Sequence, residues 1–361
     1  MALAYWAGPE ALRLIQSAGG LMPGMIRAVI GPATGPRWLA FAALDEALQD
    51  SGLLSAPAPP GRTLLVGASA GAWRMAAHAT PDPLGTLARL RESYITRRLA
   101  RGATPTQVSA AYKLLISDVF SGDAARHAVC HPHLRLGIIT ARVRGAWSQH
   151  PWMQRFRLGA ALASHVCGGA GVAKLVERVL LLGEGEDTVD VPHGQVARLT
   201  TGNFRAALLA SGSVPGYLDA VCIPDAPAGD YVDGGITDYH LAASFGSGGI
   251  TLILHHTSTL KAQWFDKHLP WRRTAKVFLD NVLVLCPDER HIASLPGAKC
   301  PDRADFLRFA SEPEERFHRW REAAARSEIL ARQFLNDLAR GDLSSLVQPL
   351  RPSSARVGDC L

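Results

Sequence analysis

The sequence contains no Cys-x-x-Cys pair. Its six cysteines are scattered over 361 residues, at Cys130, Cys167, Cys222, Cys286, Cys300 and Cys360. Scattered cysteines in so long a chain favour free thiols in a reducing compartment. The chain also begins without a basic stretch, so we expect no secretory signal and a cytoplasmic location.

Long apolar runs are missing as well. No run of about 18 apolar residues, the length that spans a bilayer, occurs without a charge. The nearest approach is Leu158–Ala173, which is rich in small residues, contains His165 and is followed by the apolar residues Leu180–Leu182. We expect a pair of buried helices here. The alternative is a hairpin that touches a membrane interface or caps a substrate pocket.

Basic residues do not form runs interleaved with aromatic residues, so we expect no nucleic-acid partner. The formal net charge of +6 still favours anionic surfaces. Arg97, Arg98 and Arg101 form a basic edge that we expect to be solvated, with anionic lipid headgroups as the alternative. Peripheral contact with a membrane therefore stays open beside the cytoplasmic location.

Metal and cofactor motifs are lacking too. Four possible ligands lie close together: His127, Cys130, His131 and His133. Metal binding needs a fixed geometry, and Pro132 interrupts any helical spacing among them. The glycine-rich residues 168–174 lack both the Gly-Lys-[Ser/Thr] ending of a phosphate loop and a preceding strand. We therefore expect no metal and no cofactor.

What the sequence does contain is a strand, a sharp turn with a serine at its tip, and a helix. Thr63–Val66 is a short apolar run typical of a buried strand. Residues 67–71, Gly-Ala-Ser-Ala-Gly, match the pattern Gly-x-Ser-x-Gly. Residues 72–77 then have the composition of a helix. This context indicates a nucleophile elbow, with Ser69 as the candidate nucleophile.

Small residues flank Ser69 because the turn is tight and leaves no room for side chains on either side. The N-terminus of the following helix brings a positive dipole end close to developing negative charge. Both features suit a serine that attacks a carbonyl group.

The remaining segments indicate one large α/β domain. We expect helices over residues 9–17, from 36, and over 84–101, 107–120, 204–210 and 314–340, and strands over 25–30, 134–140, 196–200, 250–254 and 281–285. The turn Gly31–Pro36 follows a strand and leads into a helix, so its N–H groups should point into a shared crevice. We expect a single domain over 1–343, with a core at about 25–260, a helical insertion at about 150–182, a C-terminal helix at about 312–340 and a loose tail over 344–361.

A second site candidate lies in residues 230–240, Asp-Tyr-Val-Asp-Gly-Gly-Ile-Thr-Asp-Tyr-His. A short strand ends there in the tight turn Asp233-Gly234-Gly235, which presents a carboxylate with little steric cover. A plain Asp-Gly turn without a functional role is the alternative.

Three segments together resemble the patatin-like phospholipase family, and more closely a bacterial branch of it. They are the elbow at residues 67–71, the turn at 233–235 and residues 206–216. In the last of these, a small-residue helix ends in serines, an apolar residue and a proline ahead of the aspartate turn. The resemblance covers about residues 25–260.

The resemblance implies a three-layer α/β/α patatin-like fold with a central, mostly parallel sheet. It also implies a Ser-Asp dyad in which Ser69 takes the acyl group and Asp233 accepts the serine proton. The implied activity is hydrolysis of fatty-acyl esters, such as a phospholipid, through an acyl-enzyme. A lipid or other acyl ester is accordingly the expected partner.

The family has a Gly-x-Gly-x-x-Gly turn after its first strand, whose N–H groups bind the oxyanion. The matching turn here keeps the first glycine, Gly31, but has Ala33 at the middle glycine and Pro36 at the last, and proline has no N–H. The hole would then use an N–H of residues 33–35 together with the N–H that follows the nucleophile. The expected oxyanion-binding residues are Gly31, Ala33, Thr34, Gly35 and Ala70.

Two alternatives stay open. An α/β-hydrolase triad would follow the chain order Ser, Asp, His, which this sequence also permits. The histidines after Asp233 are His240, His255, His256 and His268. The other alternative is a lipid-binding protein with little catalysis, which the prolines of the expected oxyanion turn support.

Overall fold

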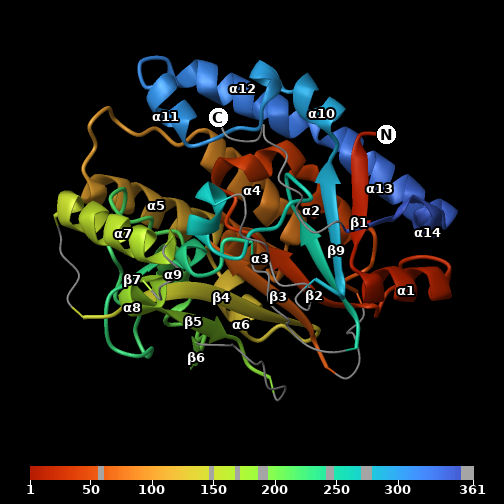
Figure 1. Ribbon diagram of the computed structural model, residues 1–361, viewed down its shortest axis with the longest axis horizontal. Coiled ribbons are helices and arrows are strands. Elements are labelled where there is room, and N and C mark those ends of the chain that lie inside the picture. Colours follow the sequence, from red (N-terminus) through yellow and green to blue (C-terminus); the bar gives the residue numbers. More distant parts are fainter. Residues whose placement is uncertain are drawn as a thin grey trace.

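The computed structural model of the chain describes residues 1–55, 61–145, 150–166, 171–185, 194–240, 248–269 and 279–350. Within these residues, ten strands form one sheet flanked by helices (Figure 1). The strand order is β10-β1-β9-β8-β2-β3-β4-β5-β6, and β7 pairs with β4 outside this path. Most neighbouring strands run parallel. The predicted α/β class with a central, mostly parallel sheet is confirmed.

The strands are β1 (Leu3–Ala7), β2 (Ile26–Gly31), β3 (Thr63–Ala68), β4 (Leu134–Val143), β5 (Val176–Leu182), β6 (Gly194–Arg198), β7 (Tyr231–Asp233), β8 (Ile250–Leu254), β9 (Val282–Pro287) and β10 (Gln348–Pro349). The α-helices of the described residues are α1 (Pro9–Ala18), α2 (Ala43–Asp50), α3 (Ala70–His78), α4 (Pro83–Ile95), α5 (Pro105–Val119), α6 (Ala124–Val129), α7 (Pro151–Val166), α8 (Gly171–Leu175), α9 (Phe204–Ser211), α10 (Glu289–Ser294), α11 (Ala304–Arg308), α12 (Pro313–Arg326), α13 (Glu328–Arg340) and α14 (Leu343–Leu346). Short 3₁₀ helices cover Gly35–Phe41, Gly234–Ile236, Trp264–His268 and Pro296–Ala298.

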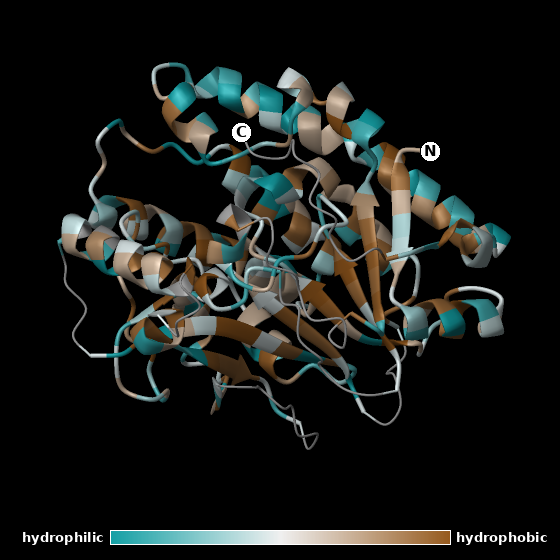
Figure 2. Cartoon of the chain, in the orientation of Figure 1, coloured by the Kyte–Doolittle hydropathy of each residue, from teal (hydrophilic) through white to brown (hydrophobic). Residues whose placement is uncertain are grey.

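Helices cover both faces of the sheet, as β4 illustrates. Alternate residues of a strand point to opposite faces. Leu136 and Ile138 belong to the main core cluster, together with buried residues of α3, α5 and α9. Ile139 belongs to a second cluster, and Ala141 to a third that includes residues of α7 and α8. The result is three layers, α/β/α, and the strands between the layers are largely hydrophobic (Figure 2).

The short strand β7 occupies a particular place beside β4. β3 pairs with β4 from Leu134 to Ile139, and β7 pairs with it from Thr140 to Arg142. Because β5 occupies the other edge of β4 from Gly137 to Val143, β7 continues the edge on which β3 ends. The end of β7 therefore lies next to the end of β3.

The sheet begins earlier in the chain than we predicted. The first strand is not residues 25–30 but β1, which is antiparallel to β9. The side chain of Gln333 on α13 accepts the N–H groups of Ala2 and Leu3 and donates to the Leu3 carbonyl oxygen. These contacts join residues far apart in the sequence, so no local pattern could indicate them.

The prediction of a loose tail from residue 344 is wrong over its described part. Leu343–Leu346 forms α14, and β10 pairs in parallel with β1 at the edge of the sheet. The N–H of Leu350 donates to the Ala7 carbonyl oxygen at 2.7 Å. The rest of the expected tail, residues 351–361, lies outside the described residues.

The apolar segment 158–182 is not a pair of buried helices, and the predicted helical insertion is only partly helical. Its end forms β5, which pairs with β4 and β6. Periodicity alone cannot distinguish a short buried strand from a buried helix. The preceding helix α7 has an exposed side, since Trp152 is 66% and Phe156 69% exposed. Residues 167–170 of this segment lie outside the described residues.

Two predicted helices have different limits. The helix expected over residues 314–340 is interrupted at Ser327, whose hydroxyl donates to the Ala324 carbonyl oxygen and accepts the N–H of Ala43. The helix expected over 84–101 ends at Ile95. Among the described helices, none is long and apolar enough to cross a bilayer.

Candidate active site

The site lies at the carboxyl edge of the parallel strands, where loops of α/β sheets converge. β2 and β3 are parallel neighbours, with Gly31 paired with Gly67. The turn after β2 and the turn after β3 therefore leave the sheet side by side. The first is the expected oxyanion turn, and the second carries Ser69.

Ser69 has the strained backbone of a nucleophile elbow. Its φ is 55° and its ψ is −133°, a conformation that residues with a side chain rarely adopt. It joins β3 directly to α3, so the hydroxyl stands at the N-terminus of that helix. The predicted strand, turn and helix around Ser69 are thus present.

Gly31 at the end of β2 and Gly71 of the elbow allow the backbones of β2 and α3 to approach closely. A Cβ added to Gly71 would lie 1.9 Å from the carbonyl oxygen of Gly31, and one added to Gly31 would lie 2.4 Å from that of Gly71. Because neither position has space for a side chain, the first turn of α3 rests directly on the end of β2. This contact fixes Ser69 relative to the turn after β2.

Asp233 ends β7 and faces Ser69. The Ser69 hydroxyl donates to Asp233 Oδ2 at 2.8 Å, and the N–H of Gly235 donates to Asp233 Oδ1 at 2.7 Å. A Cβ on Gly234 would lie 2.1 Å from the Ile139 carbonyl oxygen, so this turn also requires glycine. The two residues that the sequence singled out are therefore in direct contact, and we call them the dyad.

Both members of the dyad are buried, Ser69 at 4% and Asp233 at 5% exposure. Burial raises the pKa of the Asp233 carboxyl above its ordinary value of 3.8, against the lowering effects of the Arg303 charge and the two hydrogen bonds from Ser69 and Gly235. An Arg303 guanidinium nitrogen lies 3.9 Å from Asp233 Oδ2. A buried carboxylate with a raised pKa is a stronger base than an exposed one.

Ser211 and Ser213 tie the dyad to α9. The hydroxyl of Ser211 accepts the N–H of Ser69 at 2.9 Å and donates to the Ile139 carbonyl oxygen at 2.7 Å. The carbonyl oxygen of Ser213 accepts the N–H of Asp233 at 2.9 Å. The sequence indicates this segment only through the family resemblance. Its serines hold both dyad residues, a role that no local spacing indicates.

The expected oxyanion residues differ in what they can donate. The N–H of Ala33 donates to the Tyr239 carbonyl oxygen at 2.8 Å, and that of Thr34 donates to the Pro32 carbonyl oxygen at 2.9 Å. The folded loop already uses both N–H groups, which argues against these two as the donors to an oxyanion. Over the described residues, the N–H groups of Gly35 and Ala70 have no hydrogen-bond partner.

Thr34 offers a donor that the sequence did not indicate. Its side chain is 2% exposed, and its hydroxyl has no hydrogen-bond partner in the described structure. A buried hydroxyl without a partner costs stability, so such groups gather where a ligand satisfies them. Gly31 is the remaining residue expected at the oxyanion site. Its close contact with Gly71 positions the elbow relative to the turn after β2.

A cavity of about 460 Å³ opens beside the dyad. Its walls include Asp233 and the whole turn from Ala33 to Arg37. Leu158 of α7, Val214, Pro215, Ile236 and Trp264 give it an apolar side, while Tyr217, Tyr239, Asp302 and Arg303 are polar. Ser69 itself is not among the lining residues, but its hydroxyl donates to Asp233, which is.

Three of the histidines considered for a triad, His240, His255 and His256, form a separate cluster at the same edge of the sheet. The ring centroids of His240 and His255 are 4.2 Å apart, and those of His255 and His256 are 4.3 Å apart. Burial lowers the pKa of all three, that of His255 to about 3. No described histidine side chain hydrogen-bonds to the dyad, and the His268 side chain lies outside the described residues.

No group of three or more histidine, cysteine or acidic side chains suited to a metal occurs within the described ranges. In the histidine-rich segment that we considered for zinc, the Nδ1 atom of His131 already accepts the N–H groups of His133 and Leu134. That nitrogen is thus used to shape the loop before β4.

Comparisons with known proteins provide no further evidence on the function of this site. Searches with protein-family models and among curated proteins find no match for the chain.

Proposed function

We propose that this protein is a serine hydrolase of patatin-like type that cleaves fatty-acyl esters. The observation that carries the proposal is the 2.8 Å hydrogen bond from Ser69, at the tip of a strained elbow, to the buried Asp233. An elbow serine bonded directly to a carboxylate, without an intervening imidazole, is the arrangement that a Ser-Asp dyad requires. The three-segment resemblance supports the same assignment.

In the proposed reaction, the Ser69 oxygen attacks the ester carbonyl while its proton passes to Asp233. The tetrahedral intermediate collapses, the bond to the alcohol breaks, and Asp233 returns the proton to the departing oxygen. Water then attacks the acyl-enzyme, with Asp233 again accepting and returning a proton. The raised pKa of Asp233 suits this role, because the carboxyl group must bind the proton temporarily.

The negative charge of the tetrahedral intermediate needs hydrogen-bond donors. Ala70 follows the nucleophile and has an N–H without a partner in the described structure, as has Gly35 in the neighbouring turn. The buried Thr34 hydroxyl is a further donor without a partner in the described part of the chain. We propose that the oxyanion is bound by these three groups rather than by the N–H of Ala33.

A lipid surface is the proposed source of the substrate. The cavity has an apolar side that fits an acyl chain, and Leu158 of α7 forms part of it. On the same helix, Trp152 and Phe156 are largely exposed, and aromatic side chains favour the membrane interface. The net charge of +6 favours anionic headgroups.

The proposal is tested by hydrolysis of soluble p-nitrophenyl esters and phospholipids by the purified protein. The wild type should hydrolyse them, and Ser69→Ala should lose activity by several orders of magnitude. Ser55→Ala, which changes an exposed serine, is the matched control and should keep full activity. A folded Ser69→Ala variant with near wild-type rates, or a wild type that binds lipid without hydrolysing any ester, would overturn the proposal.

A further inference from the structure

A buried charged network joins the two helices that follow the two turns of the candidate site. Arg74 lies on α3, one helical turn after Ala70, and Asp45 lies on α2. Arg74 Nε donates to Asp45 Oδ2 at 2.7 Å, and Arg74 Nη2 donates to Asp45 Oδ1 at 2.8 Å. Neither side chain is more than 1% exposed, so this paired contact is closed off from water.

A histidine and a glutamine extend the network. The side-chain nitrogen of Gln49 lies 2.7 Å from His78 Nδ1, and His78 Nε2 lies 3.0 Å from Asp45 Oδ1. Because an amide nitrogen only donates, His78 Nδ1 accepts and its Nε2–H donates to Asp45. Burial raises the pKa of Asp45, but the Arg74 charge and the hydrogen bonds outweigh it and lower that pKa to about 2. The carboxylate at the centre of the network is therefore ionised at neutral pH.

The network acts on the segment that begins at the turn after β2. The 3₁₀ helix Gly35–Phe41 and α2 follow each other almost without interruption. The Arg74 guanidinium carbon lies 4.8 Å from the centre of the Phe41 ring, so Arg74 contacts the end of the 3₁₀ helix as well as α2. Gly35 begins this segment and Ala70 begins α3, and within the described ranges both N–H groups lack a partner. The network thus links the two segments that carry these donors.

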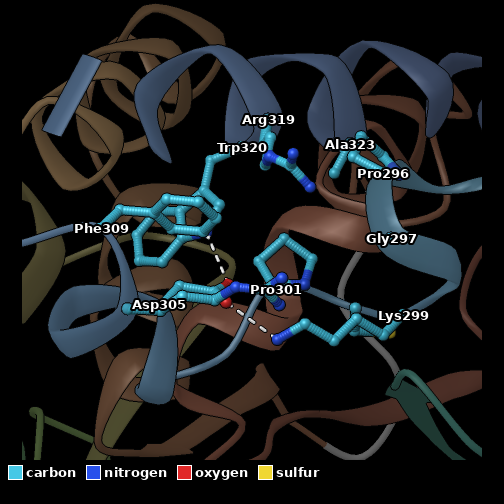
Figure 3. A pocket seen from close by; sticks show the side chains of 11 residues that line it. Pro296, Gly297, Lys299, Pro301, Asp305, Phe309, Arg319, Trp320 and Ala323 are labelled. Atoms are coloured by element: carbon cyan, nitrogen blue, oxygen red, sulfur yellow. Dashed lines mark hydrogen bonds and ion pairs between the residues drawn. The ribbon is translucent and has the colours of Figure 1, made fainter. Parts of the chain in front are cut away.

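Figure 3 shows a charged cluster that is built differently. There Lys299 Nζ donates to Asp305 Oδ1 at 2.8 Å, and the indole N–H of Trp320 donates to Asp305 Oδ2 at 3.0 Å. Lys299 keeps 39% of its side chain exposed, so its charge remains partly in water. Arg74 is fully buried, and its Nη1 atom has no hydrogen-bond partner in the described structure. Apolar side chains of similar volume are often as stable as such a buried ion pair, so stability alone does not explain it.

We infer that Arg74 and Asp45 form a positioning pair, which holds the nucleophile in register with the oxyanion donor on the neighbouring turn. This inference rests on the proposed function, because it assigns a role within the same site. The close glycine contact between the two turns fixes them where they leave the sheet. The positioning pair fixes the helices behind them, so α3 cannot slide against the segment that follows β2. A misplacement of about 1 Å at such a site costs about 100-fold in rate.

The kinetic test replaces the network with apolar side chains, which separates positioning from stability. Asp45→Leu/Arg74→Met/His78→Leu leaves no member of the network as an unpaired buried charge, so its Tm should equal or exceed that of the wild type. Its kcat for a soluble acyl ester should fall about 10- to 100-fold with little change in KM. Arg74→Lys keeps the charge but loses the paired hydrogen bonds, so its kcat should lie in between. A merely structural role would change the Tm and leave the kcat of the folded protein unchanged.

Glu46→Gln/Arg91→Gln is the matched control. Glu46 is the next residue after Asp45 on α2, and it forms an ion pair with Arg91 of α4 in which both side chains are half-buried. Because this pair joins α2 to α4 rather than to α3, its removal should leave kcat and KM at wild-type values.

An NMR readout needs no catalysis and separates this inference from the proposed function. The amides of Gly35 and Gly235 lie at the site, and neither hydrogen-bonds to a replaced side chain. Their resonances should shift or broaden in the triple variant and stay unchanged in the control. If the triple variant does not fold, Arg74→Lys supplies the same kinetic and NMR readouts.

The two proposals fail in different ways. If the wild type hydrolyses esters and the triple variant keeps its kcat and both resonances, the positioning pair is wrong and the hydrolase stands. If the wild type hydrolyses nothing but both resonances change in the triple variant alone, the positioning pair stands and the proposed function fails.

Discussion

Thr34 has two hydrogen-bond donors that could bind an oxyanion, its backbone N–H and its hydroxyl. The fold gives them different roles. Its N–H closes the turn onto Pro32, while its buried hydroxyl has no partner in the described structure. The sequence could indicate that this turn faces the site, because it follows a strand and precedes a helix. It could not indicate which hydrogen is free, since that depends on the folded shape of the loop, in which the Thr34 N–H donates to the Pro32 carbonyl oxygen.

The first prediction concerns this hydroxyl. Thr34→Val keeps the shape of the side chain but removes the donor, so kcat should fall about 100-fold with little change in KM. Stability should stay the same or rise, because a buried polar group without a partner is removed. Steady-state kinetics on a soluble acyl ester provide the measurement, with Thr86→Val, a buried threonine that does not line the cavity, as control. An unchanged kcat would show that the oxyanion is bound without Thr34.

The second prediction distinguishes the dyad from a triad. Asp233→Asn should abolish hydrolysis, whereas His240→Gln and His255→Gln should each keep a measurable fraction of it. The base must be ionised and burial raises its pKa, so the acid limb of kcat/KM should have its midpoint above 3.8. No histidine titration near pH 6.5 should appear, because burial keeps these imidazoles neutral. A folded histidine variant as inactive as Asp233→Asn would establish a triad instead.

The elements around the site differ in how far local sequence determines them. β3, the elbow and α3 follow directly from an apolar run, two glycines and a small-residue helix. The observed strand ends two residues later than the expected 63–66, and the observed helix begins two residues earlier than the expected 72–77. The sequence predicts helix at β5, because a short apolar run is compatible with a buried strand and with a buried helix. β1 and β10 depend on pairing across almost the whole chain length, which periodicity cannot reveal.

Helix α7 carries the third prediction. Trp152 and Phe156 are 66% and 69% exposed, on the helix that also contributes Leu158 to the cavity. If α7 contacts a lipid surface, Trp152→Ser and Phe156→Ser together should weaken co-sedimentation with anionic vesicles by about tenfold or more. Leu114→Ser on α5 is the matched control, since Leu114 is 62% exposed but does not line the cavity.

The electrostatic part of this contact is tested separately. Binding of the wild type should weaken as salt is raised, because exposed charges are screened within about 8–10 Å at physiological ionic strength. Equal binding to neutral and anionic vesicles would argue against a role for the positive net charge. Equal binding by the double variant and the wild type would show that α7 is not the contact.

At the scale of the whole molecule, the buried histidines couple stability to pH. Burial lowers the pKa of His255 to about 3, and it lowers those of His240 and His256 well below their ordinary value of 6.5. The unfolded chain therefore takes up protons near pH 6.5 that the folded chain does not, and stability present above pH 6.5 is lost as pH falls below it. The carboxyl groups of Asp233 and Asp238, whose pKa values burial raises, act in the opposite direction.

The fourth prediction follows from this coupling. The free energy of unfolding should be lower at pH 5.5 than at pH 7.5, with each fully buried histidine contributing up to about 1.4 kcal/mol per pH unit. His255→Gln should reduce this pH dependence, which urea unfolding at the two pH values measures. The same difference between pH 7.5 and 5.5 in His255→Gln as in the wild type would mean that His255 does not cause it.

The measurement that tests the central claim most directly is covalent labelling of the native protein with a fluorophosphonate, read out by mass spectrometry of the intact chain and of its peptides. An activated Ser69 should give one label per chain, on the peptide that contains Ser69. Ser69→Ala should take up none, and Asp233→Asn should react far more slowly because the proton acceptor is gone. A wild type that is not labelled, or a label that persists in Ser69→Ala, would contradict the account.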